Sequence, residues 1–387
     1  MPILNRAAEL QDEVAGWRRH IHENPGILYD VHHTADFVAE KLKEFGVDAV
    51  ETGIGQTGVV GIIRGKNPGS RTIGFRADMD ALPLTEVTGA EWASKTPGKM
   101  HACGHDGHTA MLLGAAKYLA ETRNFTGTLA VVFQPAEEGG RGADAMVKDG
   151  LMERFGIQEI YGMHNRPGIP LGHFAIRKGA IMGAPDKFAI TLTGRGGHAA
   201  EPHNTIDPIA IGAHIVSNIQ LIAARNVNPL RSIVVSVTRF QSGTTHNIIP
   251  ETAELEGTVR TLDEAVRDFA EGRLRQLVET IASVHGAKAT FEYERACPVT
   301  INHDAETLHA AEAAIAIAGA AKVDTDTDPM MAGEDFSFML NARPGAFIFI
   351  GNGDSAGLHN PAYDFNDEAI GYGISFWARL AEQRLGG

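Results

Sequence analysis

The chain has 387 residues, more than one ordinary hydrophobic core holds, so we expect about two domains. Hydrophobic residues make up 43% of it, which is typical of globular proteins and argues against a disordered chain. The formal net charge of −14, without a long basic cluster, argues against nucleic acid or a membrane surface as a partner. Two cysteines in unlike contexts, and no signal peptide or membrane span, lead us to expect a cytoplasmic protein without disulfides.

The first part of the chain alternates between helical and strand patterns. Apolar residues at a 3.6-residue period or in short continuous runs, bounded by glycine, proline and charged residues, identify the elements. We expect helices over residues 4–22, 34–45, 106–120 and 143–148, and strands over 58–65, 71–78, 127–135 and 157–163. This alternation predicts an α/β fold with a mostly parallel sheet that helices cover on both faces.

The pattern then changes to half-exposed strands and long helices. We expect strands over residues 186–194, 232–240, 251–261 and 289–295, and helices over 207–224 and 263–284. This β-α-β-β-α-β order predicts an inserted ferredoxin-like domain. Helices over 305–318 and 368–384 and a strand over 346–350 resume the first pattern. We therefore expect a discontinuous catalytic domain of residues 1–183 and 297–387, interrupted by a second domain of residues 184–296.

Residues 100–109, MHACGHDGHT, concentrate the side chains that bind transition metals, with Cys103 and His105 the strongest candidates. Further donors follow expected strand ends, where ligand sites of open α/β sheets lie. They are Asp78, Asp80, Glu137, Glu138 and His164, joined by His359 after the last strand. We therefore predict a metal site at this edge, in which one of the adjacent carboxylates Glu137 and Glu138 binds metal and the other activates water.

Competing interpretations use fewer of these residues. Cys103 at a helix N-terminus could be a nucleophile with a histidine as its base, but the paired glutamates and other histidines would then have no role. Gly53–Gly58 matches a dinucleotide fingerprint, yet it precedes a strand instead of following one. In the inserted domain, His198 and Asn247 could be ordinary turn residues, and Arg260 either a solvated arginine or a clamp for a substrate carboxylate.

A series of motifs between residues 74 and 361 resembles one family of enzymes. The motifs are GFRADMDALPL, MHACGHDGHT, VFQPAEEGGRGA, GMHN, GRGGHAAEPH, SGTTHNIIPE, GTVR, AGEDF and LHNP. They are similar to the co-catalytic metallo-amidohydrolases of the aminoacylase/carboxypeptidase G superfamily, in the branch of hippurate and indole-acetyl-amino-acid hydrolases. Broader members begin their site with His-x-Asp, whereas this chain has Asp78-Met-Asp80 and, by the resemblance, takes the missing imidazole from His105.

The resemblance implies specific roles for these residues. The expected ligands of two divalent ions are Cys103, His105, Glu138, His164 and His359, with Cys103 as the bridging thiolate. Glu137 would be the general base and acid, and Asp80 would orient a ligand imidazole without itself binding a metal ion. His198, often supplied by the partner subunit, would polarise the scissile carbonyl. Asn247 and Arg260 would bind the substrate, Arg260 through its carboxylate.

The resemblance also implies an activity. We expect a metal-dependent amidohydrolase that cleaves N-acyl-L-amino acids such as hippurate into a carboxylate and an amino acid, using zinc, manganese, cobalt or nickel. The inserted domain would serve as a lid and as the contact of a homodimer. The main alternative is a dipeptidase or carboxypeptidase with the same dinuclear site. A non-catalytic metal binder remains open, although it would have no use for a base beside Glu138.

Overall fold

The computed structural model describes residues 4–386, so residues 1–3 and 387 of the expected catalytic domain lie outside the described part. The described chain forms two compact units. The first contains the N-terminal part up to Ile181, Thr300–Asp328 and the C-terminal part from Asp335. The second contains Met182–Val299 and the short segment Pro329–Glu334, which is remote from it in sequence.

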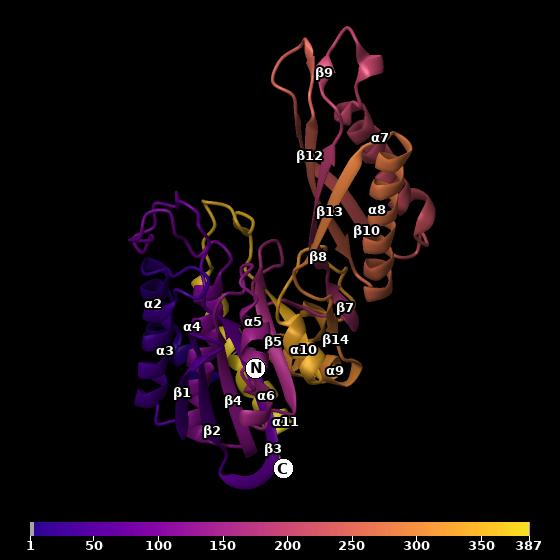
Figure 1. Ribbon diagram of the computed structural model, residues 1–387. Coiled ribbons are helices and arrows are strands. Elements are labelled where there is room, and N and C mark those ends of the chain that lie inside the picture. Colours follow the sequence, from indigo (N-terminus) through magenta and orange to yellow (C-terminus); the bar gives the residue numbers. More distant parts are fainter. Residues whose placement is uncertain (1–3, 387) are drawn as a thin grey trace. The chain divides into compact units, whose positions relative to one another are not determined.

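An eight-stranded sheet forms the centre of the first unit (Figure 1). Its strands, in spatial order, are β1 (Ala49–Ile54), β2 (Gly58–Arg64), β4 (Thr126–Gln134), β3 (Asn67–Asp78), β5 (Glu159–Arg166), β16 (Gly345–Gly351), β6 (Phe174–Ala175) and β15 (Val323–Asp324). The central pairs β4/β3, β3/β5 and β5/β16 are parallel, whereas β1/β2, β2/β4 and β16/β6 are antiparallel. The prediction of a mostly parallel sheet is thus confirmed for its centre.

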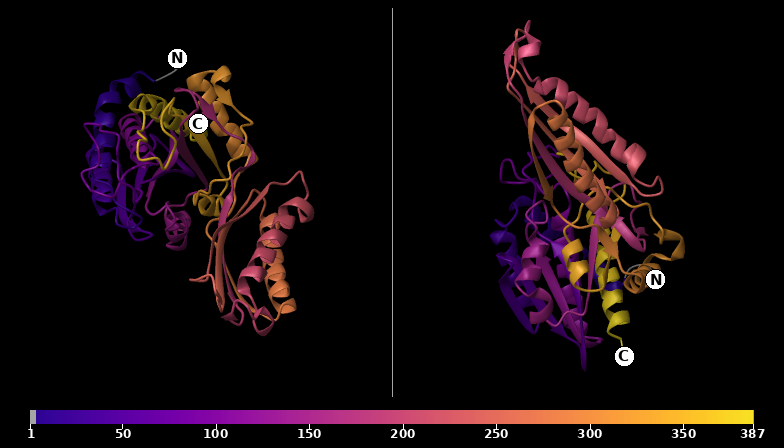
Figure 2. Two further views of the ribbon diagram at one scale, coloured as in Figure 1. Left: turned by 90° about the horizontal axis from the view of Figure 1, so that it is seen from above. Right: turned by 45° about the vertical axis from the view of Figure 1, so that its right-hand side comes forward.

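Helices on both faces explain why the central strands are apolar throughout (Figures 1 and 2). All seven residues of β16 are buried, and α4 (His105–Thr122) is itself almost completely buried because it packs against β3, α2 and α11. The other helices are α1 (Asn5–Glu9), α2 (Gln11–Glu23), α3 (His32–Glu44), α5 (Gly142–Lys148), α6 (Leu151–Arg154), α9 (Asp304–Ala318), α10 (Ser337–Ala342) and α11 (Ile370–Arg384). Residues 4–22, expected to form one helix, form α1 and α2 with Leu10 between them.

The second unit has the expected β-α-β-β-α-β order. Its elements are β8 (Ala184–Thr193), α7 (Pro208–Leu221), β10 (Ile233–Ser242), β12 (Thr252–Thr261), α8 (Glu264–Val284) and β13 (Lys288–Arg295). The antiparallel sheet has the order β10-β12-β8-β13, the ferredoxin-like arrangement. Alternate residues of β8 are buried against α7 and α8. Asp207 caps the first turn of α7, and Asp263 caps the first turn of α8.

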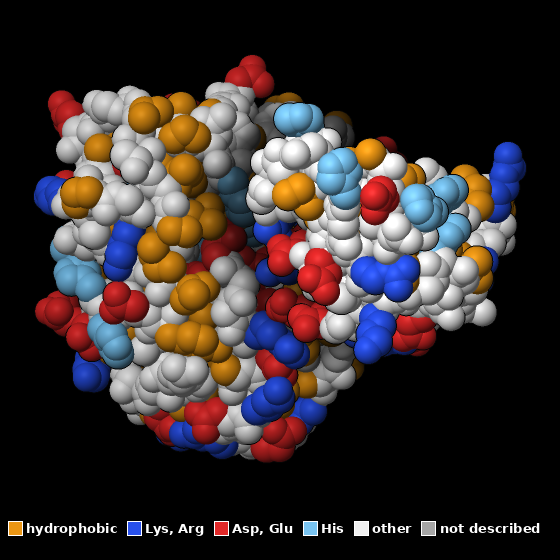
Figure 3. All heavy atoms as spheres, turned by 45° about the horizontal axis from the view of Figure 1, so that its top comes forward, with side chains coloured by type: hydrophobic (Ala, Val, Ile, Leu, Met, Phe, Trp, Pro, Cys, Tyr) orange, Lys and Arg blue, Asp and Glu red, His pale blue; other side chains and the backbone are white. Residues whose placement is uncertain are grey.

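Shorter elements complete the two units. In the second unit, β9 (Gly197–His198) pairs with β11 (Ile248–Ile249). Strands β7 (Gly179–Met182) and β14 (Thr300–Asn302) pair with each other. Within residues 4–386, no helix is both long and apolar enough to cross a membrane. On the face shown in Figure 3, acidic and basic side chains are interspersed, so no uniformly basic surface is displayed there.

Candidate metal centre

The candidate donors lie where the central strands of the first unit end. Strand β3 ends at Asp78, β4 ends at Gln134 just before the two glutamates, and β5 carries His164. Helix α4 begins at His105, and Gly104 precedes it with φ +88°. A Cβ atom at Gly104 would lie 2.2 Å from Asn165 Nδ2 and 2.5 Å from Tyr363 Oη, so only glycine fits the turn that joins Cys103 to His105.

Two groups of potential ligands share Cys103. In the first, donor atoms of Cys103, His105 and His164 lie within 4.8 Å of one another, and in the second those of Cys103, Glu138 and His359 do. The Cys103 Sγ to His164 Nε2 distance is 3.4 Å, and His359 Nε2 lies 3.3 Å from Glu138 Oε1. The structure therefore brings all five expected ligands together, with the thiol common to both groups.

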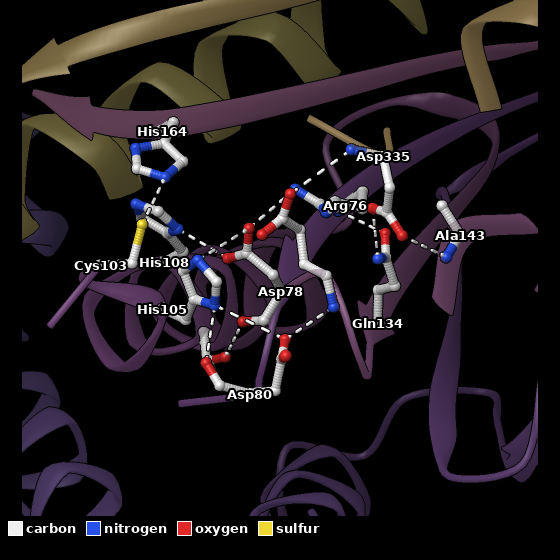
Figure 4. A network of polar contacts seen from close by, with 12 residues as sticks. Arg76, Asp78, Asp80, Cys103, His105, His108, Gln134, Ala143, His164 and Asp335 are labelled. Carbon is white, nitrogen blue, oxygen red and sulfur yellow. Dashed lines mark hydrogen bonds and ion pairs between the residues drawn. The ribbon is translucent and has the colours of Figure 1, made fainter. Parts of the chain in front are cut away.

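Hydrogen bonds at the far side of two imidazoles leave their other nitrogens to face this centre (Figure 4). His105 Nδ1 donates to the carbonyl oxygen of Asp80 at 2.7 Å, and His164 Nδ1 donates to the carbonyl oxygen of Asn165 at 2.6 Å. His105 Nε2 is buried and has no hydrogen-bond partner among the described residues. A buried imidazole nitrogen of fixed tautomer beside a thiol and a carboxylate is suited to a divalent transition metal, so the residues fit such an ion.

Burial and neighbouring charges shift the pKa values of these donors from their ordinary values. Burial raises the pKa of the Cys103 thiol, and the charge of Glu138 adds to the effect. Hydrogen bonds to Cys103 and Glu138 raise the pKa of His359 to about 10. Burial holds the pKa of His164 well below its usual range. A bound cation would therefore displace protons from Cys103 and His359, whereas His164 is already neutral.

Asp80 organises the loop that carries Glu137 and Glu138. Its carboxylate is buried, with Oδ1 accepting the backbone N–H of Glu137 at 2.9 Å and Oδ2 that of Glu138 at 3.1 Å. The carbonyl oxygen of Asp80, rather than its carboxylate, accepts the His105 hydrogen bond, because the carboxylate lies 3.6 Å from His105 Nδ1. Asp80 thus contacts both a candidate ligand and the candidate base segment.

A buried ionic network that the sequence analysis missed lies behind the centre (Figure 4). Asp78 accepts hydrogen bonds from His108 Nδ1 at 2.6 Å and from Arg76 Nη1 at 2.9 Å, and its Oδ2 lies 3.6 Å from His105 Nε2. Arg76 also contacts Asp335 at 3.3 Å. The available signal was the charge of Arg76 beside the apolar residues of this strand, since a charge in a buried strand needs buried partners.

Asp335 extends the same network to α5. Its Oδ1 accepts from Gln134 Nε2 at 2.7 Å, and its Oδ2 accepts the backbone N–H of Ala143 at 3.0 Å. The backbone N–H of Asp335 lies 3.4 Å from Glu137 Oε1. Glu137 belongs to neither donor group that contains Cys103, but its carboxylate lies within 4.8 Å of donor atoms of His105 and Glu138.

The other expected site residues belong to the second unit and lie at two places in it. His198 on β9 and Asn247 beside β11 are adjacent, because the Ala199 N–H donates to the Asn247 carbonyl at 3.1 Å. Both side chains are exposed. Arg260 lies near the far end of β12, donates to Thr258 Oγ1, and lines a cavity of about 540 Å³ on the sheet. Residues 252–260 of β12 alone span about 26 Å at the usual strand rise.

Known proteins are similar to this chain in sequence and fold over most or all of their length. The model of Peptidase family M20/M25/M40 matches residues 74–383. Hippurate hydrolase of Campylobacter jejuni is 42% identical over 385 residues and covers 100% of both chains. Thermostable carboxypeptidase 2 of Saccharolobus solfataricus is 42% identical over 354 residues, covering 90% of this chain and 88% of its own. The crystal structure of the Bacillus subtilis YXEP protein, a dinuclear metal-binding peptidase of family M20, superposes with TM-score 0.85 at 34% identity, covering 98% of this chain and 99% of that one.

Proposed function

Since the chain belongs to Peptidase family M20/M25/M40, we propose that it hydrolyses the amide bond of N-acyl-L-amino acids of the hippurate type. The products are a carboxylate and a free amino acid. The observation that carries this proposal is the pair of donor groups sharing Cys103, with the carboxylate of Glu137 beside them but outside both. The full-length similarity to a hippurate hydrolase supports the choice of substrate class.

Two divalent cations would be held by Cys103, which belongs to both donor groups, together with His105 and His164 from one group and Glu138 and His359 from the other. When bound, such ions polarise the amide carbonyl and increase the acidity of water. A thiolate with imidazoles and carboxylates suits zinc, cobalt, nickel or manganese, and supply in the cell selects among them.

Glu137 is the proposed general base and acid. Its carboxylate takes a proton from the attacking water and passes it to the leaving nitrogen. The Asp80 carboxylate fixes the backbone of Glu137 through its N–H group, which limits where the side chain can reach. The adjacent residue Glu138 is a ligand instead, so the two neighbouring carboxylates have separate tasks.

The substrate contacts proposed for the second unit require two copies of it. His198 polarises the scissile carbonyl, Asn247 binds near it, and Arg260 holds the amino-acid carboxylate. Because β12 separates Arg260 from the His198–Asn247 pair by about 26 Å, one small substrate cannot contact both ends of the same unit. We therefore propose a homodimer formed through the inserted domain, residues 184–296, in which His198 and Asn247 serve the partner's substrate while the domain acts as a lid.

A dipeptidase or carboxypeptidase activity on the same centre is the second candidate. The similarity to thermostable carboxypeptidase 2 favours it. Both reactions cleave an amide bond next to an amino acid with a free carboxylate, and they differ in whether the other side is an acyl group or a peptide. A panel of N-benzoyl, N-acetyl and dipeptide substrates on metal-reconstituted protein separates them by kcat/KM.

The decisive experiment compares Glu137→Ala with Glu138→Ala. We expect Glu137→Ala to keep its metal content and to lose at least about 10³-fold in kcat, since it removes only the base. Glu138→Ala should lose bound metal as well as turnover. Glu91→Ala, on a loop outside the centre, serves as the control. Normal turnover by the Glu137→Ala enzyme would refute the mechanism, and metal-free protein with full activity would refute the metal centre.

A further inference from the structure

A fully buried arginine outside the proposed centre contacts three carboxylates. Arg18 on α2 has an exposed fraction of 0%. Its Nε donates to Asp367 Oδ1 at 2.7 Å, and its Nη1 lies 3.1 Å from Asp364 Oδ1 and 3.6 Å from Asp106 Oδ2. None of these four residues belongs to the proposed ligands or is the proposed base.

The three carboxylates come from two segments that carry proposed ligands. Asp106 directly follows His105 in the first turn of α4. Asp364 follows His359 on the same loop, and Asp367 begins the short 3-10 helix Asp367–Ala369 that directly precedes α11. Arg18 is therefore the shared counter-ion of the turn that bears His105 and the loop that bears His359.

The two segments also contact each other at the centre itself. The His359 N–H donates to the Ala102 carbonyl at 2.8 Å, and His359 has a left-handed backbone with φ 61°. The side chain of His359 is 56% exposed, whereas that of His105 is fully buried. The imidazole of His359 contacts Glu138 at 3.3 Å but is largely open to solvent, so its position depends also on the loop that carries it.

Without Arg18, the charges at this junction would separate the two segments. Asp106 retains His22 Nδ1 at 2.8 Å, and Asp367 retains Arg19 at 2.9 Å. Among the described residues, the Asp364 carboxylate would keep the indole N–H of Trp92 at 3.3 Å, which is a neutral donor. Arg18 is the cation that contacts both Asp106, which is fully buried, and Asp364, which is 35% exposed, so its loss leaves these two like charges to repel each other. The loop would then move away from α4 and take His359 with it.

We propose that Arg18 is a positioning residue that fixes the His359 loop against the first turn of α4 and thereby determines how tightly the protein holds its metal ions. The proposal rests on the metal centre proposed above. Ligand geometry is sensitive to the groups that orient the ligands, and losing such a group typically lowers metal affinity about 10-fold to 100-fold.

The test uses metal-stripped full-length protein titrated with Co(II) and Zn(II) against a competing chelator. We expect Arg18→Met to weaken the binding of at least one ion about 10-fold to 100-fold and to alter the visible spectrum of the Co(II) protein. At saturating metal, kcat should fall while KM stays within about twofold, since Arg18 contacts no proposed substrate residue. Arg18→Lys should restore part of the affinity, because it keeps the charge but not the fork that reaches several carboxylates.

The matched control is Arg19→Met. Arg19 is the neighbouring residue, binds the same Asp367, and lies 3.9 Å from the Trp92 ring, but it makes no contact with Asp106 among those described. We expect its metal affinity to stay within about twofold of that of the unmodified protein. Equal losses in the Arg18→Met and Arg19→Met proteins would overturn the proposal, because they would indicate a general loss of stability.

A milder variant keeps the proposal testable if Arg18→Met does not fold. Asp364→Asn removes the charge of one of the three carboxylates that contact Arg18, at a side chain that is 35% exposed. This variant should bind one metal ion more weakly and leave the Co(II) spectrum of the other ion unchanged. Unchanged affinity for both ions in folded Arg18→Met or Asp364→Asn protein would overturn the inference. Unchanged metal binding by His359→Ala would instead refute the proposed centre itself.

Discussion

Replacing Asp80 with alanine removes the carboxylate that accepts the backbone N–H groups of Glu137 and Glu138 at 2.9 and 3.1 Å. A hydrogen bond to a charged group contributes about 1.5–3 kcal/mol, so the two together contribute about 3–6 kcal/mol. Burial nevertheless raises the pKa of Asp80 above its ordinary value, which means that desolvation of the carboxylate offsets part of this gain. We therefore expect Asp80→Ala to lower the free energy of unfolding of the metal-free protein by about 2–4 kcal/mol.

Activity should fall further than stability alone explains. The hydrogen bond from His105 goes to the carbonyl of Asp80 and survives the substitution, so that imidazole keeps its orientation. The loop carrying Glu137 loses its anchor, and a displacement of about 1 Å in a catalytic group costs about 100-fold in rate. Urea unfolding and kcat at saturating metal measure the two effects separately.

Two further variants calibrate the Asp80 result. Asp80→Asn retains one accepting oxygen and presents an amide N–H to the other backbone N–H, so it should lie between the unmodified protein and Asp80→Ala. Asp149→Ala removes a carboxylate that accepts the Gly55 N–H at 3.0 Å on the surface, and it should cost less than about 1 kcal/mol. An Asp80→Ala protein with unfolding free energy within about 1 kcal/mol of the original and full kcat would refute the reasoning.

Three shorter predictions concern the metal, pH and backbone geometry. Chelators should abolish turnover reversibly. Cys103→Ser should weaken the binding of both metal ions, as measured by metal analysis after dialysis, and loss of only one ion would contradict a bridging thiol. Burial lowers the pKa of His22, but the charge of Asp106 outweighs it and raises that pKa from 6.5 to about 9. His22 should therefore add up to about 3 kcal/mol to the free energy of unfolding below pH 6.5 and lose this contribution as the pH rises through about 9. The urea midpoints of the unmodified protein and of His22→Gln should accordingly converge above about pH 9. Gly104→Ala should destabilise the protein by at least about 2 kcal/mol in thermal unfolding, since its φ is +88° and its Cβ would overlap Asn165; a neutral effect would contradict the described turn.

The helices and strands whose apolar residues recur with a clear period could be predicted from the sequence, and those without such a period could not. Alternating burial along β8 and the helical period of α8 follow directly from residues with one buried and one exposed face. Strand β1 was missed because five of its six residues are exposed or half-buried, which leaves no alternation in the sequence. Strand β3 begins at Asn67, earlier than expected, since its first residues are exposed and include Pro68 and Gly69.

The candidate donors could be named from sequence because thiol, imidazole and carboxylate groups rarely follow apolar strands without a reason. Their assembly agrees with those expectations, while their roles remain predictions. The ionic partners behind them could not be foreseen. Arg76 and Asp335 are 259 residues apart, and Arg18 and Asp367 are 349 residues apart. No local pattern links such pairs, since buried charges are paired by the fold and not by spacing.

The position of β16 sets the order in which the chain can fold during synthesis. It lies between β5 and β6. One edge of β5, the strand that carries His164, therefore has no hydrogen-bonded neighbour until Gly345–Gly351 has been made. The whole ferredoxin-like unit is synthesised in the meantime, and its local contacts allow it to form first. An open strand edge is a template for aggregation. The nascent chain therefore exposes an unfinished sheet edge from the synthesis of Arg166 to that of Gly345, and we expect its yield in the cell to depend on chaperones more than the stability of the finished protein would suggest.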